Sequence, residues 1–182
     1  PKLGALVPLI AGGAAMLMRQ IALNIAFVCS TRRTQAMDVT GVAAASYAIT
    51  NQVYSLGVVI MLAFQAAGAT LVPSALAAGE KEKAGGGEAA ARTMADRLIG
   101  WATMVAAGLA VAQAASMPFL TPIFTPLVEV RKAIARPALV SALVQLTNGP
   151  VFAGEGIMMG LGAFGPLALL TSIGVSVMVA GL

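Results

Sequence analysis

The sequence predicts an all-α fold: a polytopic membrane bundle of about five transmembrane helices. Hydrophobic residues make up 59% of the chain and charged residues only 10%, whereas about a quarter of the residues in a soluble domain are charged. The charges are also clustered. No Lys, Arg, Asp or Glu occurs in residues 39–79, 98–128, 137–154 or 156–182. A helix needs roughly 20 apolar residues to cross the hydrocarbon core, so every run except the third is long enough by itself.

The predicted helices cover residues 3–30, 40–78, 98–120, 137–158 and 166–182, within a single transmembrane domain spanning residues 1–182. The first contains Arg19 and ends before the polar stretch "STRRTQAMD". The second would be roughly 60 Å long as one helix, about twice the thickness of the hydrocarbon core. It is therefore either one long span or two short spans folded at Gly57, and we favour one span.

Residues 79–96, "GEKEKAGGGEAAARTMAD", are charged and rich in glycine, which predicts a solvated loop with a short helix. The third helix is expected to stop at "MPFLTPIFTP", because each proline removes a backbone donor. The segment "EVRKAIAR" then predicts a separate interfacial turn whose basic side chains reach the headgroups. The fourth helix is expected to start at Pro137, and the fifth at Pro166.

The basic residues do not orient the protein in the membrane. Five spans would place Arg32, Arg33, Arg131, Lys132 and Arg136 on one side and Lys2, Lys81, Lys83, Arg92 and Arg97 on the other. The two sides are equal, so the positive-inside rule leaves the orientation open. Because the net charge of +4 lies beside apolar runs, it indicates contact with a lipid bilayer and not with nucleic acid.

The residue types do not indicate an enzyme. The chain has one cysteine, Cys29, and no histidine, so it offers neither an internal disulfide, nor a Cys/His zinc site, nor a Ser-His or Cys-His catalytic pair. We expect no catalytic residues, no metal site and no resident cofactor from these residues.

Polar residues follow helical spacing within the apolar runs. One face of the fourth helix carries Ser141, Gln145, Asn148, Phe152 and Glu155, and a similar face on the second helix runs from Tyr47 to Gln65. Such faces either provide hydrogen bonds between packed helices or line a central cavity. The cavity candidates are Glu155, Asn148, Gln145, Gln20, Asn24, Asn51 and Tyr54.

Glu155 lies in the stretch "VFAGEGIMMGLGAF", which is otherwise apolar or glycine. It is 19 residues beyond Arg136, or roughly 28 Å along a helix, which predicts a position toward the far rim of the membrane. Gly156 and Gly160 form a small-xxx-small pair that predicts close helix packing. Glu155 is therefore expected to be a polar anchor beside a packing seam more than a buried proton carrier.

Three segments resemble the multidrug and toxic compound extrusion (MATE) family. "AAASYAITNQVYSLGVVIMLAFQAAGATLVPSALAAGEKEKA" resembles the second helix of a lobe and its basic loop, and "FAGEGIMMGLGAF" is similar to a later acid-glycine motif of that family. The opening "LGALVPLIAGGAAMLMRQIALN" is similar to the first helix of the C-terminal lobe. The glutamate before the glycine, at Glu155, is typical of the plant and plastid branch.

The resemblance implies one incomplete lobe, helices seven to eleven of a twelve-helix transporter that exports organic cations or metabolites in exchange for protons or sodium. The second lobe would then be a missing partner, and Glu155 would match the acid of the tenth helix. Two positions depart from the family pattern. Met16, with Arg19 nearby, stands where coupled members carry an acid, and Ala163 and Phe164 replace the acid that ends the later motif.

These departures leave a second hypothesis open: a transporter-derived, non-transporting structural or linker subunit of a larger membrane complex. The plastid-like motif suggests a thylakoid or envelope membrane and, as one such complex, a photosystem–antenna supercomplex. In that case chlorophyll or carotenoid would lie against the apolar outside of the chain, with Glu155, Gln52 and Asn148 as candidate ligands.

Overall fold

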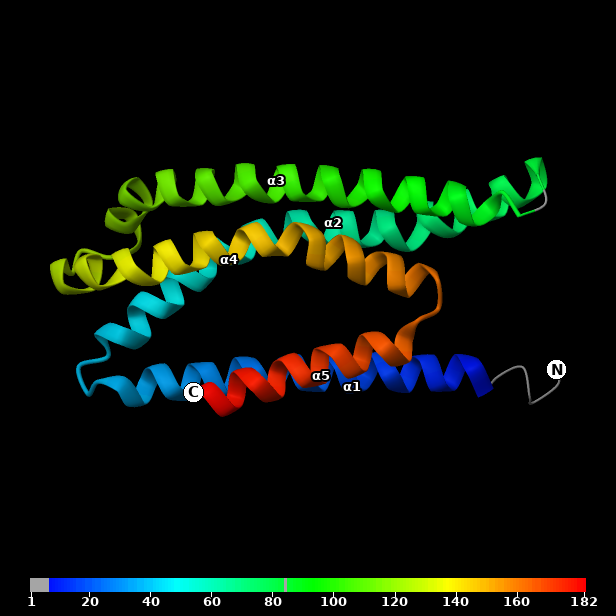
Figure 1. Ribbon diagram of the computed structural model, residues 1–182. Helices are drawn as coiled ribbons and strands as arrows, with labels where there is room; N and C mark the ends of the chain where they lie inside the picture. Colours follow the sequence, from blue (N-terminus) through cyan, green and yellow to red (C-terminus); the bar gives the residue numbers. More distant parts are fainter. Residues whose placement is uncertain (1–6, 84) are drawn as a thin grey trace.

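The computed structural model describes residues 7–83 and 85–182, which form five helices (Figure 1). They are α1 (Val7–Met37), α2 (Val42–Glu82), α3 (Gly87–Phe124), α4 (Val128–Gly160) and α5 (Phe164–Gly181). The predicted all-α class is therefore confirmed. Four helices are long and apolar enough to cross a membrane: α1 from Ile10, α2, α3 and α5. Helix α4 is outside this set, and Gln145, Asn148 and two prolines lower the hydropathy of its central part.

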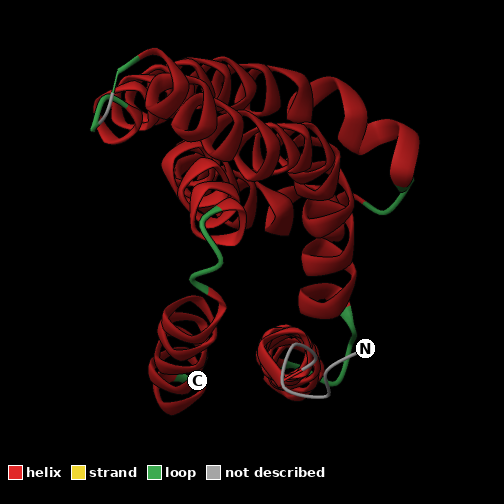
Figure 2. Ribbon diagram, turned by 90° about the vertical axis from the view of Figure 1, so that its right-hand side faces the viewer, coloured by secondary structure: helices red, strands yellow, loops and turns green. Residues whose placement is uncertain are grey.

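The helices form two groups (Figure 2). Helices α2, α3 and α4 pack against one another as a three-helix bundle, while α1 and α5 pair with each other beside it. Neighbouring helices in the chain run in opposite directions, so α1 and α5 run the same way (Figure 1). Helix α2 begins beside α1 and slants into the bundle, so it joins the two groups at one end. The turn between α4 and α5 joins them at the other end.

Small residues allow the bundle to pack closely. The buried face of α3 includes Ala91, Ala102, Ala106 and Ala110, spaced at multiples of about one turn. Such residues let helix backbones approach, which is how membrane helices gain van der Waals contact. Buried apolar side chains form two clusters between the three helices. One contains Val53, Met117, Val130, Ile134 and Ala138, and the other contains Leu98, Ala102 and Ala153.

Several predicted helix ends differ from the observed ones. Helix α1 continues through "STRRTQAM" to Met37, and residues 79–82 and 87–96 are helical. The separate turn predicted for "EVRKAIAR" is the first part of α4. Residues 3–6 of the predicted first helix lie outside the described residues. The charges mark where a helix leaves the apolar region, but Ala-rich sequence such as "EAAARTMADR" remains a good helix former in water.

Helix α3 ends at Phe124, within "MPFLTPIFTP" as predicted, but four prolines do not end the helices that contain them. Pro118 and Pro122 lie inside α3, and Pro137 and Pro150 lie inside α4. Membrane helices tolerate proline because neighbouring groups and local adjustments satisfy the freed carbonyls. Helix α3 bends toward its end, where Pro118 and Pro122 lie (Figure 1), as expected when a proline removes a helix hydrogen bond. Helix α2 is continuous through Gly57, which confirms the single helix and excludes a fold at that glycine.

The turn between α1 and α2 is held by Asp38. Its carboxylate accepts hydrogen bonds from the Thr40 hydroxyl at 2.6 Å and from the Ala43 amide at 2.8 Å. The turn also needs Gly41, whose φ of 76° lies in the left-handed region that favours glycine. The hydrogen bond from Thr40, followed by that from Ala43, lowers the pKa of Asp38 below its ordinary value of 3.8.

This lowered pKa predicts a specific loss of stability in acid. Because the folded-state pKa of Asp38 is below the unfolded value, its contribution is complete above pH 3.8 and is lost as the pH falls through the folded-state pKa. Exchange of the Ala43 amide should therefore accelerate below pH 3.8 in the wild type. In Asp38→Asn, which cannot ionise, this acceleration should be absent after correction for intrinsic exchange. Equal pH profiles for the two proteins would contradict the prediction.

Candidate functional site

Glu155 is held by side chains from two other helices. Its Oε2 atom accepts hydrogen bonds from Arg19 Nη2 on α1, with which it forms an ion pair, and from Gln65 Nε2 on α2 at 2.7 Å. Only 12% of the Arg19 side chain and 17% of the Glu155 side chain are exposed. We call these three residues the Arg19–Gln65–Glu155 cluster. It ties the α1/α5 pair to the three-helix bundle through opposite charges.

The pairing of Arg19 with Glu155 is expected in an apolar environment. An unpaired acid or base inside a membrane helix is costly, and such residues almost always pair with one another or with backbone carbonyls. Arg19 Nε is buried without a hydrogen-bond partner in the described part of the chain. The Glu155 carboxylate is already bound by the Arg19 side chain through Nη2.

A second polar network joins α2 and α4 within the bundle. The buried Asn148 side chain donates to Gln145 Oε1 at 2.9 Å and to the Tyr54 hydroxyl at 3.0 Å, and Tyr54 can donate back to Asn148 Oδ1 at 3.1 Å. Gln145 is fully buried, and its Nε2 atom has no partner among the described residues. Helix α2 can approach Gln145 closely because Gly57 has no Cβ atom. A Cβ atom there would lie only 2.5 Å from Gln145 Nε2.

The network predicts unequal effects of removing its members. Tyr54→Phe should lower the free energy of unfolding by about 0.6 kcal/mol, the average for one interhelical hydrogen bond in a membrane protein. Asn148→Ala should cost more, about 1–3 kcal/mol, because it leaves Gln145 Oε1 buried without its donor. Unfolding titrations in mixed micelles measure both values. Gln52→Ala, at an exposed position of α2, is the control and should be near neutral; a larger loss for Tyr54→Phe than for Asn148→Ala would contradict the ranking.

A seam of glycines on α4 faces the backbone of its neighbours. A Cβ atom at Gly156 would lie 2.1 Å from the Gln65 carbonyl oxygen, one at Gly160 would lie 2.8 Å from the Ala69 carbonyl oxygen, and one at Gly149 would lie 2.5 Å from the Ala102 carbonyl oxygen. Gly156 and Gly160, which the sequence singled out for packing, both lie against α2. The seam brings the backbone of Gln65 next to Glu155, so helix packing and the polar cluster are built together.

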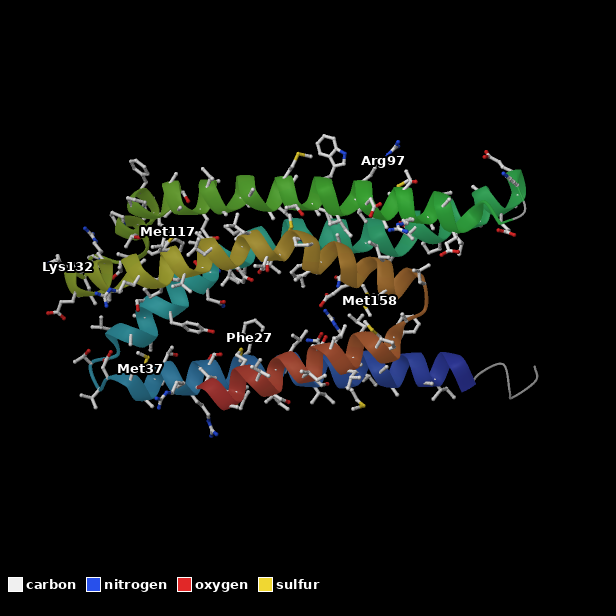
Figure 3. All side chains as sticks on the ribbon, viewed as in Figure 1. Phe27, Met37, Arg97, Met117, Lys132 and Met158 are labelled. Carbon is white, nitrogen blue, oxygen red and sulfur yellow. The ribbon has the colours of Figure 1, made fainter. Side chains whose placement is uncertain are left out.

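An open pocket of about 650 Å³ lies between the α1/α5 pair and the bundle. We call it the interhelical groove. Its lining comes from one face of α1, the polar face of α2, the first half of α4 and the end of α5, and consists of Leu23, Ala26, Phe27, Ser30, Tyr47, Thr50, Asn51, Tyr54, Arg136, Pro137, Val140, Ser141, Val144 and Met178. Figure 3 shows Phe27 extending from α1 toward the bundle.

The groove contains only some of the residues predicted to line a cavity. Asn51 and Tyr54 lie in it, whereas Gln20 and Asn24 are exposed and outside it. The reason is helical spacing. Arg19, Leu23 and Ser30 share the face of α1 that meets the bundle and the groove, and a shift of one residue turns a side chain by about 100°. Glu155, Gln145 and Asn148 also lie outside the groove lining, in the two polar contacts described above.

Arg19 is the site residue that the polar spacing missed. It is the one charged residue between Lys2 and Arg32, and Glu155 is the one charged residue after Arg136. Charges inside apolar helices usually pair with one another, so this isolation was a usable signal for the contact.

The three candidate pigment ligands have different environments. Glu155 is bound by Arg19 and Gln65, and Asn148 is buried in the network with Tyr54 and Gln145. Gln52 is exposed on α2. Of the three, only Gln52 presents an accessible side chain to a ligand outside the helices.

Comparison of the chain with protein-family models, with curated proteins and with solved structures gave no match. The resemblance to the MATE family therefore rests on the sequence motifs quoted above.

Proposed function

We propose that the protein is a non-transporting structural subunit of a larger membrane assembly, built on a transporter-like set of helices. The observation that carries this proposal is the state of Glu155. Its carboxylate is paired with Arg19 and hydrogen-bonded by Gln65, with little exposed surface. A group that takes up and releases a coupling ion needs access and a variable charge. Here Arg19 and Gln65 occupy the carboxylate instead, so Glu155 fastens α4 to α1 and α2.

The outer surface of the chain agrees with a structural role. Within the apolar windows of α1 and α5, only 6% and 11% of the residues are buried inside the described structure. Large apolar side chains therefore remain on the outside of the pair, among them Leu17, Ile21, Leu169, Leu170 and Ile173. Lipid or other membrane subunits must cover this surface. On the likeness to the plastid branch, we place the assembly in a thylakoid or envelope membrane, with a photosystem–antenna complex as the instance to test.

Native mass measurement tests this proposal. The complex is extracted from its source membrane in mild detergent, and every chain in it is identified. We expect the protein to be retained with defined partner subunits, together with chlorophyll or carotenoid if the assembly is photosynthetic. An isolated monomer of the full-length gene product under the same mild conditions would overturn the structural role.

A second candidate, part of a MATE-type antiporter, is favoured by the position of the interhelical groove. It opens between two helix groups and carries polar side chains on the α2 face, and transporter sites commonly lie between such groups. Proton- or sodium-driven efflux of an organic cation from proteoliposomes of the full-length gene product would support this candidate. The role of the acid requires that Glu155→Gln abolish the efflux while Asn24→Ala, outside the groove, leaves it intact.

A further inference from the structure

The two ends of the molecule differ in charge. One end carries Arg32, Arg33, Arg131, Lys132 and Arg136, with only Asp38 and Glu129 as acids. The α1–α2 and α3–α4 turns are both at this end, as the positions of Met37 and Lys132 show (Figure 3). At the opposite end, the described basic residues Lys81, Lys83, Arg92 and Arg97 are matched by Glu80, Glu82, Glu88 and Asp96, while Lys2 lies outside the described residues. The excess of positive charge is therefore at the end that contains Arg136.

The interhelical groove starts at this basic end and runs toward the interior. Arg136, Ser30 and Tyr47 lie at its basic end, while Val144 and Leu23 lie farther from that end along α4 and α1. Eight residues separate Arg136 from Val144, or roughly 12 Å along α4. The groove is thus polar and cationic near the membrane surface and mainly apolar farther in.

The charge of the groove selects its ligand. None of its lining residues is acidic, and Arg136 is exposed without an ion pair to any described residue. An organic cation would meet repulsion at this mouth, whereas an anionic headgroup would meet a guanidinium that binds phosphate well. A volume of about 650 Å³ is also within the range of pockets that hold one small ligand.

We propose that the interhelical groove binds one anionic phospholipid. The guanidinium of Arg136 binds the phosphate, and an acyl chain lies between α1 and α4 against Phe27, Val140 and Val144. This orientation of the lipid agrees with the position of the groove in a membrane. The cationic end of the groove is at the membrane surface, and its apolar end points toward the membrane interior. This lipid would fill the space between the α1/α5 pair and the bundle on the side away from the Arg19–Gln65–Glu155 cluster. The inference does not depend on whether the protein is a structural subunit or part of an antiporter.

Native mass spectrometry of the complete chain in detergent tests this inference, with phosphatidylglycerol and phosphatidylcholine of identical acyl chains as probes. We expect one phosphatidylglycerol to bind in preference to phosphatidylcholine. Arg136→Gln should weaken phosphatidylglycerol binding about fivefold, as expected for one basic contact near the membrane surface. The control Lys132→Gln removes a charge from the same end but outside the groove, and it should leave binding within about twofold.

A second pair of variants tests the acyl-chain position. Val140→Trp should obstruct the groove, whereas Leu143→Trp, at an equally exposed position of α4 outside it, should not. A phosphatidylglycerol with a photoreactive group in its acyl chain should label residues 23–30 and 137–144. Equal affinity for the two lipids, equal effects of Arg136→Gln and Lys132→Gln, or exclusion of lipid by a second copy of the chain would each overturn the proposal. None of these readouts measures partners or efflux, so their failure is distinct from failure of the proposed function.

Discussion

Arg19→Met is expected to lower the free energy of unfolding by about 3 kcal/mol, which is the low end of the cost of breaking a buried ion pair. The variant leaves the Glu155 carboxylate in an apolar environment with Gln65 as its remaining side-chain partner. Methionine keeps much of the length of the arginine side chain, so the loss of stability reflects the missing charge more than the missing volume. Reversible unfolding in mixed micelles, followed by circular dichroism, measures the change.

The double variant Arg19→Met/Glu155→Met distinguishes the contribution of the ion pair to stability from that of the packing around it. Replacing both charges by apolar groups of similar size removes the desolvation cost together with the attraction, so most of the lost stability should return. If the double variant is as unstable as Arg19→Met alone, the unpaired carboxylate is not the cause of the loss. Lys132→Met, at an exposed basic position, is the control and should have little effect.

Gly156→Ala is the second change expected to have a large effect, a loss of about 2–3 kcal/mol, near the upper end for overpacking a core. The added methyl group would lie 2.1 Å from the Gln65 carbonyl oxygen. Backbone cannot rotate out of the way as a side chain can, so α2 and α4 must move apart. The same movement would lengthen the contact between Gln65 and Glu155.

Gly154→Ala is a matched control in the same helix, because nothing lies within 4 Å of a Cβ atom there. Alanine is a better helix former than glycine by about 1 kcal/mol, so this variant should be neutral or more stable. The two unfolding midpoints should therefore move in opposite directions. Equal destabilisation of both variants would mean that glycine serves the flexibility of α4 and not the approach of α2.

Much of the bundle could be predicted because apolar runs between charges have one physical solution in a membrane. Each run must satisfy its backbone hydrogen bonds internally, so each becomes a helix. The helix ends were less predictable, because charge marks where a span leaves the membrane and not where the helix stops in water. Charge ends an apolar span, but "EAAARTMADR" and "STRRTQAM" continue as helix beyond it, and Pro137 is inside α4 instead of at its start.

The site could be predicted in part. Helical spacing correctly grouped the polar faces of α2 and α4, which meet through Tyr54 and Asn148 and through Gln65 and Glu155. The face of α1 could not be chosen in the same way, because this helix is apolar around most of its circumference and its partners lie far away in the sequence. Gln20 and Asn24 form a local polar pair, but the ion pair with Glu155 of α4 places Arg19 toward the bundle instead.

The pairing of α1 with α5 has a consequence for biosynthesis. Of the five described helices, α1 is synthesised before the others and its neighbour α5 after them, and Arg19 is 136 residues ahead of Glu155. At about 5–20 residues per second, the arginine waits roughly 7 to 27 s for its counter-charge. During this interval Arg19 has no counter-charge from Glu155, so we expect its side chain to snorkel toward the headgroups. Synthesis of α4 supplies Glu155 to Arg19, and α5, which follows α4, can then pack against α1.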